Sequence, residues 1–292
     1  MIKKADERMI PRLKQIWQIC FGDDAKGTDF VFGNLLCTDQ MLVKTDENGQ
    51  PVAMLNWKLL NFTTDNQPLP GAYIFGVATL PEYRGKGIST ALMEKADELL
   101  RGQGARLACL VPAEKSLFDF YGQRGYDTWF YYKALRVRSE DIPKPRAGGA
   151  LRAAALEDLH VRRNAAFGSR ALFGSWEAEY LRYTGMECRF YGGEVLRFFG
   201  GDNGGYLVCY PRGNGILIKE AVFAPQDIGL LLAAVDGRYR AASYELRLPV
   251  DFEIYGKWAS EILPFGMVKW YDSESVNALS RGSAPWFAFG LD

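Results

Sequence analysis

The segment from Val77 to Thr90 combines residue types that bind phosphate groups. A strand-like run is followed by a short loop and then by a helical pattern, and the loop reads Glu82-Tyr-Arg-Gly-Lys-Gly87. The free backbone N–H groups and the positive dipole end of a helix N-terminus attract anions. Gly85 and Gly87 let the backbone approach a phosphate closely, and Arg84 and Lys86 add positive charge. We therefore predict an anion-binding loop in front of this helix.

Two common phosphate-binding patterns do not fit this loop. A dinucleotide GxGxxG loop needs glycine where Thr90 stands, and the Gly-Lys-Ser/Thr end of a Walker loop is absent. The segment instead resembles the acetyl-CoA loop of the GNAT acyltransferase superfamily, whose pattern is Arg/Gln-x-x-Gly-x-Gly/Ala. Arg84 and Gly87 match this pattern, and Ser89 stands where the family usually has glycine or alanine.

A second segment strengthens the resemblance, which covers residues 1–138. Leu110-Val-Pro112 ends a strand-like run, and Phe120-Tyr-Gly-Gln-Arg-Gly-Tyr126 follows. The resemblance implies that pantetheine inserts between two diverging parallel strands and bonds to the backbone of Val77 and Thr79. It also implies that the amides from Gly85 to Thr90 hold the pyrophosphate. The acetyl-CoA site so implied comprises Val77, Ala78, Thr79, Arg84, Gly85, Lys86, Gly87, Ile88, Ser89 and Thr90.

Tyr121 matches the family tyrosine that donates a proton to the leaving thiolate. A phenol with a pKa near ~10 can donate a hydrogen bond to a thiolate whose conjugate acid has a pKa near ~8.5. A core tyrosine is the structural alternative. The run Tyr73–Leu80 lacks the glutamate base that many family members carry, so deprotonation of the amine would use water or another carboxylate. Asp23, Asp24 and the C-terminal Asp292 are candidates, although a loop and an ordinary tail also explain them.

Other chemistries find little support. The five cysteines are odd in number and lack CxxC spacing, so we expect most of them, Cys109 included, to be buried thiols rather than parts of disulfides or a zinc site. His160 is the only histidine and is expected to be structural. The aromatic run from Trp129 to Tyr132 fits the wall of an amine pocket and a packed strand equally well. We predict no metal site.

The two halves of the chain share a series of local signals. Helical patterns end at Phe21 and Phe167, and strand-like runs end at Pro81 and Pro225. Matches in the same order indicate a duplicated α/β unit. Between the halves lies a segment with two prolines and two glycines, which cannot continue a helix or a central strand. The sequence predicts a first domain at 1–138, a linker at 139–149 and a second domain at 150–292.

The second unit lacks the signals of an acetyl-CoA site. Counting from the matching prolines, Ile228 stands in the place of Arg84 and Leu231 in the place of Gly87. Counting from Gly266, Ile262 stands in the place of Tyr121. We therefore expect a degenerate unit that covers the first one and completes one wall of an amine cleft at the junction.

Charge and hydropathy exclude several partner classes. The 292 residues include 35 basic and 35 acidic side chains, so the formal net charge is zero, without the basic excess of nucleic-acid binders or polybasic membrane binders. Apolar runs are far shorter than the ~18 residues of a spanning helix, and the charged start lacks a signal-peptide core. We expect a cytoplasmic protein that binds neither nucleic acid nor membrane. The sequence is compatible with a homo-oligomer.

Together these observations favour an α/β fold of two tandem GNAT-like units, each with a mixed central sheet flanked by helices. This layout resembles the enhanced-intracellular-survival (Eis) type of tandem acetyltransferase without its sterol-carrier-like domain. The resemblance implies an acetyl-CoA-dependent N-acetyltransferase that acts on a small-molecule or peptide amine by direct attack in a ternary complex. The alternatives are a CoA-binding or protein-interaction module without turnover, and an aminoacyl or peptidyl transferase on the same duplicated fold.

Overall fold

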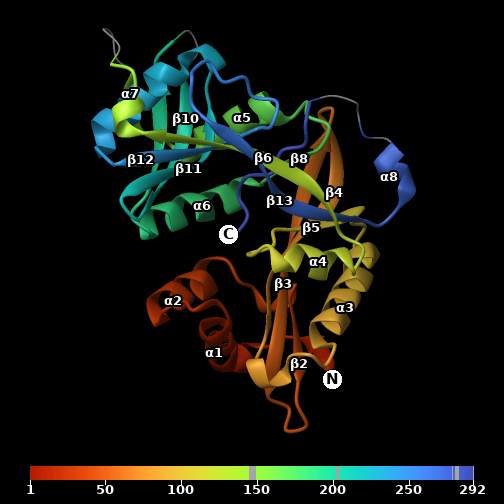
Figure 1. Ribbon diagram of the computed structural model, residues 1–292. Helices are drawn as coiled ribbons and strands as arrows, with labels where there is room; N and C mark the ends of the chain where they lie inside the picture. The colour runs from red at the N-terminus through yellow and green to blue at the C-terminus, as the bar shows by residue number, and fades with distance from the viewer. Residues whose placement is uncertain (145–148, 202–203, 278, 280–282, 292) are drawn as a thin grey trace.

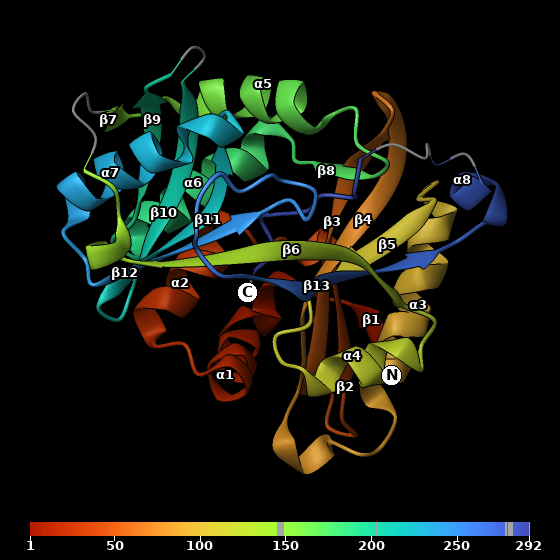
Figure 2. The ribbon, with the colours of Figure 1, turned by 45° about the horizontal axis from the view of Figure 1, so that its top comes forward.

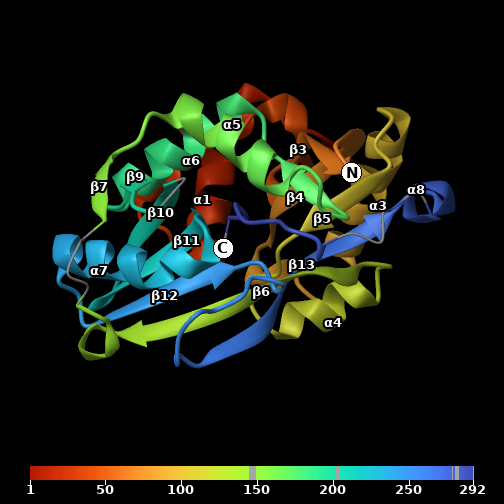
Figure 3. The same ribbon diagram turned by 90° about the horizontal axis from the view of Figure 1, so that it is seen from above.

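A single curved sheet of thirteen strands runs through both halves of the chain (Figure 1). The structure is a computed structural model, and it describes residues 1–144, 149–201, 204–277, 279 and 283–291. Seen from above, the strands follow a curve with α6 and the C-terminal segment on its inner side (Figure 3). A mixed sheet flanked by helices confirms the predicted fold class.

The first half alternates strands and helices around the predicted loop. Its strands are β1 (Ile2–Lys4), β2 (Met41–Thr45), β3 (Pro51–Thr64), β4 (Gln67–Thr79), β5 (Leu107–Leu110) and β6 (Asp127–Arg138). Its helices are α1 (Ile10–Phe21), α2 (Ala25–Asn34), α3 (Ile88–Gly102) and α4 (Ser116–Gly122). The helix expected directly after Gly87 is therefore present and ends at Gly102.

The second half repeats part of this order. Its strands are β7 (Ala150–Ala153), β8 (Phe173–Ser175), β9 (Glu194–Phe199), β10 (Gly205–Arg212), β11 (Gly215–Val222), β12 (Ser243–Leu248) and β13 (Ser260–Trp270). Its helices are α5 (Leu156–Phe167), α6 (Ala178–Phe190), α7 (Ile228–Tyr239) and α8 (Ser273–Asn277). Helices α1 and α5 end at the two phenylalanines that the repeat singled out.

The two halves are joined by an exchange of strands. The strand order is β1-β2-β3-β4-β5-β13-β6-β12-β11-β10-β9-β7, with β8 paired to β3. Strand β13, from the end of the chain, thus lies between β5 and β6 and is antiparallel to both. On its other side β6 pairs with β12, and Figure 2 shows β6 and β13 side by side across the middle of the molecule. The division of the chain at 139–149 stays a prediction.

Helices cover both faces of the sheet in the first half. Figure 1 shows α1 and α2 on one side of β3 and α3 on the other. One hydrophobic core holds α1, α2 and α6 with the segment Trp286–Phe289, so it spans both halves. A second core lies beneath α3, whose Leu92, Met93, Ala96 and Leu100 are buried on one face of the helix. Among the described residues, none of the helices combines the length and hydrophobicity needed to span a bilayer.

Two polar clusters fix the exchanged segments. Asp97 of α3 accepts hydrogen bonds from Lys269 (2.6 Å) and from the Tyr271 hydroxyl (2.7 Å), which ties β13 and the residue after it to the first half. In the second half, Glu220 is fully buried and forms an ion pair with Arg163 at 2.7 Å.

The same Glu220 carboxylate also accepts hydrogen bonds from the Tyr206 hydroxyl (2.5 Å) and from the Trp286 indole (3.0 Å). Trp286 belongs to the C-terminal segment, so this buried carboxylate anchors that segment to the sheet.

Candidate active site

Strands β4 and β5 begin as neighbours and then separate. They are parallel and pair only where Gly71, Ala72 and Tyr73 meet Leu107, Ala108 and Cys109. Further along β4, the register with β3 shifts at a bulge around Gly76, whose φ is +58°. The Asn56 amide donates a 3.3 Å hydrogen bond to the Gly76 carbonyl and so supports the bulge. Beyond Tyr73, β4 therefore has no pairing with β5, as the prediction of splayed parallel strands requires.

The predicted loop leads from β4 into α3. The amides of Tyr83 and Arg84 bond back to the chain before them, whereas those of Gly85 to Gly87 have no partner among the described residues. Gly85 and Gly87 have φ values of +73° and +71°, which lie in the left-handed region that glycine adopts without strain. No atom lies within 4 Å of a Cβ built at either residue, so the space beside the loop is open. The first helical hydrogen bond joins the Ala91 amide to the Gly87 carbonyl at 3.0 Å. The amides of Ile88 to Thr90 therefore form the unpaired N-terminus of a 15-residue helix.

Side chains of the loop brace its backbone. The Arg84 Nε donates to the Thr79 carbonyl at 3.0 Å, and the Thr79 and Ser89 hydroxyls are 3.0 Å apart. The Lys86 ammonium donates to the Glu82 carbonyl (3.1 Å). Arg84 thus closes the loop by a hydrogen bond to β4 and brings its charge close to the amides of α3.

A cavity of about 810 Å³ lies between this loop, the end of β4 and α4. Its lining includes nine of the ten residues predicted for acetyl-CoA, and Lys86 is the exception. Beside these nine, the cavity wall contains Cys20, Phe21, Tyr83, Ala113, Glu114, Leu117, Phe120, Tyr121 and Arg124. The structure therefore brings the two sequence segments of the resemblance together around one space, while the binding role of each residue stays a prediction.

Tyr121 lies in the wall of this cavity, on α4. It is 8% exposed, and burial raises the pKa of its hydroxyl to about 12, with a smaller opposite effect from the charge of Arg124. The hydroxyl is therefore protonated at neutral pH. Its ring packs edge-on against Tyr126, a neighbour whose hydroxyl is buried and does not line the cavity. Tyr121 thus combines burial in the core with a place at the cavity.

Arg124 is a cavity residue that sequence reasoning missed. Its guanidinium donates to the Thr90 hydroxyl at 2.6 Å and lies 3.5 Å above the Phe120 ring centroid. It joins the end of α4 to the first turn of α3 and adds a second arginine to the cavity. The signal was present, because Arg124 lies inside the segment Phe120–Tyr126 that carried the resemblance.

The candidate bases occupy different surroundings. Asp24 caps α2 by accepting a 2.7 Å hydrogen bond from the Gly27 amide, and Asp23 accepts one of 2.7 Å from the Trp17 indole. Neither lines the cavity, whereas Glu114 does. Asp292 lies outside the described residues, although the Leu291 amide beside it donates to the Tyr73 hydroxyl at 2.8 Å.

The remaining candidates serve packing. His160 lies on α5 and bonds to Asn164 at 3.1 Å. The run Trp129–Tyr132 forms part of β6, and its rings pack on aromatic residues of β13 and the C-terminal segment. All five cysteines are free, and Cys109, Cys188 and Cys209 are buried. Within the described ranges, no group of three or more His, Cys, Asp or Glu side chains is arranged to hold a metal ion.

The corresponding place in the second half is filled. Ile228 and Leu231 are 1% and 0% exposed and belong to the core beneath α7. The predicted pairing of Ile262 with Tyr121 is wrong, because Ile262 lies inside β13 whereas Tyr121 lies on a helix. Counting from Gly266 failed because this glycine sits at a bulge within a strand rather than in a turn after a helix.

Comparison with solved structures extends over both halves. A conserved protein of unknown function from Enterococcus faecalis, described as a probable N-acyltransferase, has a TM-score of 0.75 and 19% identity, covering 94% of this chain and 73% of its own. A GCN5-related N-acetyltransferase from Anabaena variabilis has a TM-score of 0.77 and 17% identity, with coverages of 94% and 74%. Eis1 from Mycobacterium abscessus has a TM-score of 0.67 and 16% identity, with coverages of 94% and 75%. At these identities the likeness concerns the fold.

Comparison of the sequence itself gives a more local result. No curated protein matches the chain. Residues 1–129 match the model of the acetyltransferase (GNAT) domain, the stretch that contains the loop, α3 and Tyr121. These findings support acetyl transfer in general terms and locate its family signature in the first half of the chain.

Proposed function

We propose that the protein is an acetyl-CoA-dependent N-acetyltransferase acting on the amine of a small molecule or peptide. The observation that carries the proposal is the single cavity that joins the gap between β4 and β5, the open N-terminus of α3 and Tyr121. The cavity has room for a long cofactor arm and a positive end for phosphates, and the protonated phenol of Tyr121 forms part of its wall.

Acetyl-CoA would bind along this cavity from loop to strand gap. The amides from Gly85 to Thr90 would hold the pyrophosphate, because they have no helical partners and lie at the positive end of α3. Arg84 and Arg124 add charge beside them. The pantetheine would continue along Val77 and Thr79, where β4 has no pairing with β5.

Transfer requires a neutral amine and a proton for the leaving group. The amine nitrogen attacks the thioester carbonyl carbon, the new C–N bond forms, and the C–S bond breaks with its electron pair on sulfur. The thiolate then takes a proton from the Tyr121 hydroxyl, which is available because that hydroxyl is protonated at neutral pH. The proton that the amine loses passes to water and restores the phenol.

We further propose an Eis-like tandem arrangement in which only the first unit binds acetyl-CoA. The buried Ile228 and Leu231 support this, since they fill the place of the loop in the second half. A cytoplasmic location stays a prediction. A CoA-binding or protein-interaction module without turnover, and an aminoacyl or peptidyl transferase, remain the competing functions.

The test is release of free thiol from acetyl-CoA in the presence of an amine panel that contains polyamines, amino sugars and peptides. We expect amine-dependent thiol release and an acetylated product identified by mass spectrometry. Acetyl-CoA binding without turnover on any amine would favour the binding module. Turnover of an aminoacyl donor with no acetyl-CoA affinity would favour the third function.

Tyr121→Phe tests the proposed proton donor, and Tyr126→Phe is its matched control. Both changes remove one hydroxyl from a buried tyrosine, but only Tyr121 lines the cavity. We expect Tyr121→Phe to lower kcat by about 10²–10⁴-fold, with acetyl-CoA affinity nearly unchanged. Equal kcat values for the two variants would mean that Tyr121 has a packing role and does not donate the proton.

A further inference from the structure

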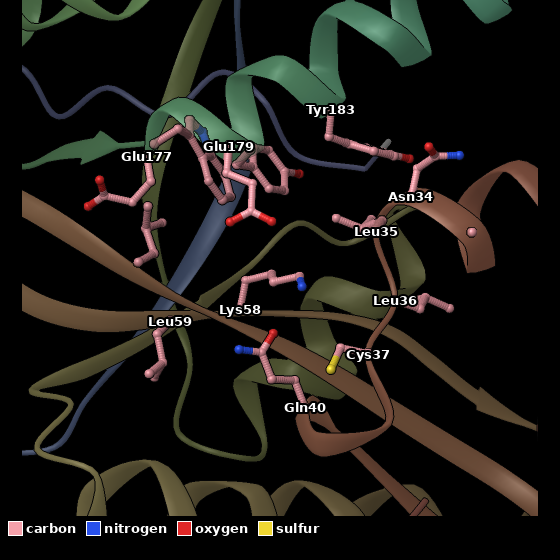
Figure 4. A pocket seen from close by; sticks show the side chains of 14 residues that line it. Asn34, Leu35, Leu36, Cys37, Gln40, Lys58, Leu59, Glu177, Glu179 and Tyr183 are labelled. Atoms are coloured by element: carbon pink, nitrogen blue, oxygen red, sulfur yellow. The ribbon is translucent and has the colours of Figure 1, made fainter. Parts of the chain in front are cut away.

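A second cavity, of about 320 Å³, lies on the α2 face of the sheet, beside β3 (Figure 4). Its walls come from the end of α2 and the following loop, from β3, and from the start of α6. It shares no lining residue with the cavity beside the glycine loop. It is therefore a separate space from the proposed acetyl-CoA site.

Opposite charges face this cavity without forming an ion pair. Lys58 projects into it from β3, and Glu179 projects into it from α6; Figure 4 shows the Lys58 ammonium between the Glu179 carboxylate and the Gln40 amide. Within the described part of the chain, the Lys58 ammonium makes no hydrogen bond and no salt bridge. Burial lowers the pKa of Lys58, against smaller opposite effects of Cys37 and Glu179. An anion beside it would restore the stabilisation that water supplies elsewhere.

Three further polar atoms of residues in the wall are buried and unpartnered within the described residues, and the Trp176 indole nitrogen is one of them. The Tyr183 hydroxyl and the Gln40 side-chain oxygen have no hydrogen-bond partner among the residues that the structure describes. Tyr183 is 5% exposed, and its hydroxyl points toward the Asn34 side of the cavity in Figure 4. A buried hydroxyl that donates to nothing is costly, so these atoms favour a polar ligand.

Part of the wall is apolar. Four leucines contribute to it, two from the loop after α2 and two from β3: Leu35, Leu36, Leu59 and Leu60. A ligand that fits this cavity therefore needs a compact apolar group to contact the leucines, beside its charged groups.

We propose that this cavity binds an α-amino acid with an apolar side chain in its zwitterionic form. The carboxylate would accept hydrogen bonds from Lys58 and Tyr183, and the ammonium group would donate to Glu179 and the Gln40 oxygen. The side chain would lie against the leucines. A simple anion would meet the carboxylate of Glu179, and a simple cation would meet Lys58, so a molecule carrying both charges fits best.

The experiment is calorimetry on the full-length protein with L-leucine, L-methionine and L-phenylalanine as probes. Two derivatives of L-leucine serve as controls: its methyl ester removes the carboxylate charge, and its N-acetyl form removes the ammonium charge. We expect the free amino acids to bind and each derivative to bind about tenfold more weakly or worse, since hydrogen bonds to charged groups are the stronger ones. Equal binding of L-leucine and its derivatives, or no binding of any probe in the millimolar range, would overturn the proposal.

Substitutions locate the site and separate it from acetyl transfer. Lys58→Met and Glu179→Gln should each weaken L-leucine binding about tenfold or more, whereas Lys257→Met, a change at an exposed lysine outside both cavities, should leave it unchanged. Gly87→Glu should retain L-leucine binding even where it loses acetyl-CoA. Displacement of L-leucine by acetyl-CoA would place the amino acid in the other cavity and refute this site, whatever becomes of the acetyltransferase proposal.

Discussion

Gly87→Glu, compared with Gly104→Glu, isolates the function of the loop from its effect on folding. The two glycines flank α3, with φ values of +71° and +86°, and no atom lies within 4 Å of a Cβ built at either one. Both substitutions therefore add the same side chain to the same backbone conformation in open space. The 15 residues of α3 separate the two positions by about 22 Å.

The expected stability changes can be worked out from these positions. A residue with a Cβ costs about 1–2 kcal/mol in the left-handed conformation. A glutamate offsets about 0.3–1 kcal/mol of this cost at a helix N-terminus and adds a similar amount at a C-terminus. Gly87→Glu should thus lose less than about 2 kcal/mol of unfolding free energy, and Gly104→Glu up to about 3 kcal/mol.

Acetyl-CoA affinity should fall in Gly87→Glu, although this variant is expected to lose less stability than Gly104→Glu. At position 87 the new carboxylate would stand where the pyrophosphate is proposed to lie, and juxtaposed like charges cost several kcal/mol, or about 100-fold or more in affinity. Gly104→Glu should bind acetyl-CoA as the unchanged protein does. Thermal unfolding and calorimetry on both variants measure the two quantities. Unchanged acetyl-CoA affinity in Gly87→Glu, or an equal loss in both variants, would refute the loop assignment.

Three further predictions concern the whole fold. Glu220→Gln leaves the buried Arg163 without its counter-charge and should lower the unfolding free energy by about 3–5 kcal/mol, measured by urea titration; a loss below about 1 kcal/mol would contradict the buried pair. Truncation after Arg138 removes β12 and β13, so the product should be poorly soluble or acetylate amines inefficiently; full amine turnover would argue against a role for the second half. Burial raises the pKa of Tyr121 and other tyrosines above the value near ~10 of the unfolded chain. The unfolded state then loses protons first, and unfolding free energy should fall above about pH 10 by up to about 1.4 kcal/mol per pH unit for each such tyrosine, which denaturation at several pH values checks.

The local features of the site could be predicted from the sequence. Gly87, the helix after it and the strand before Pro81 are short-range signals, because turn residues and periodicity act within a few positions. The gap between β4 and β5 followed from resemblance rather than from any local pattern.

Long-range features escaped prediction for a physical reason. The run Leu107–Leu110 is apolar throughout and buried on both faces, so it would accept many neighbours, and nothing in it selects Met267–Trp270 as its partner. Lys58 and Glu179 are isolated charges far apart in sequence, and only the packing of α6 over β3 brings them to one cavity. The error at Gly266 has the same origin, because a glycine at a strand bulge and one in a turn look alike in sequence.

The insertion of β13 between β5 and β6 has a consequence during synthesis. The strand that completes the first half of the sheet leaves the ribosome about 150 residues after β5, which at ~5–20 residues per second is a delay of roughly 8–30 s. Throughout that interval β5 has an open edge on an apolar strand, and such edges pair readily with other chains. Early collapse of β6 onto β5 would close this edge but would also block the place of β13. Correct folding of the nascent chain therefore requires that the place between β5 and β6 be open when β13 arrives.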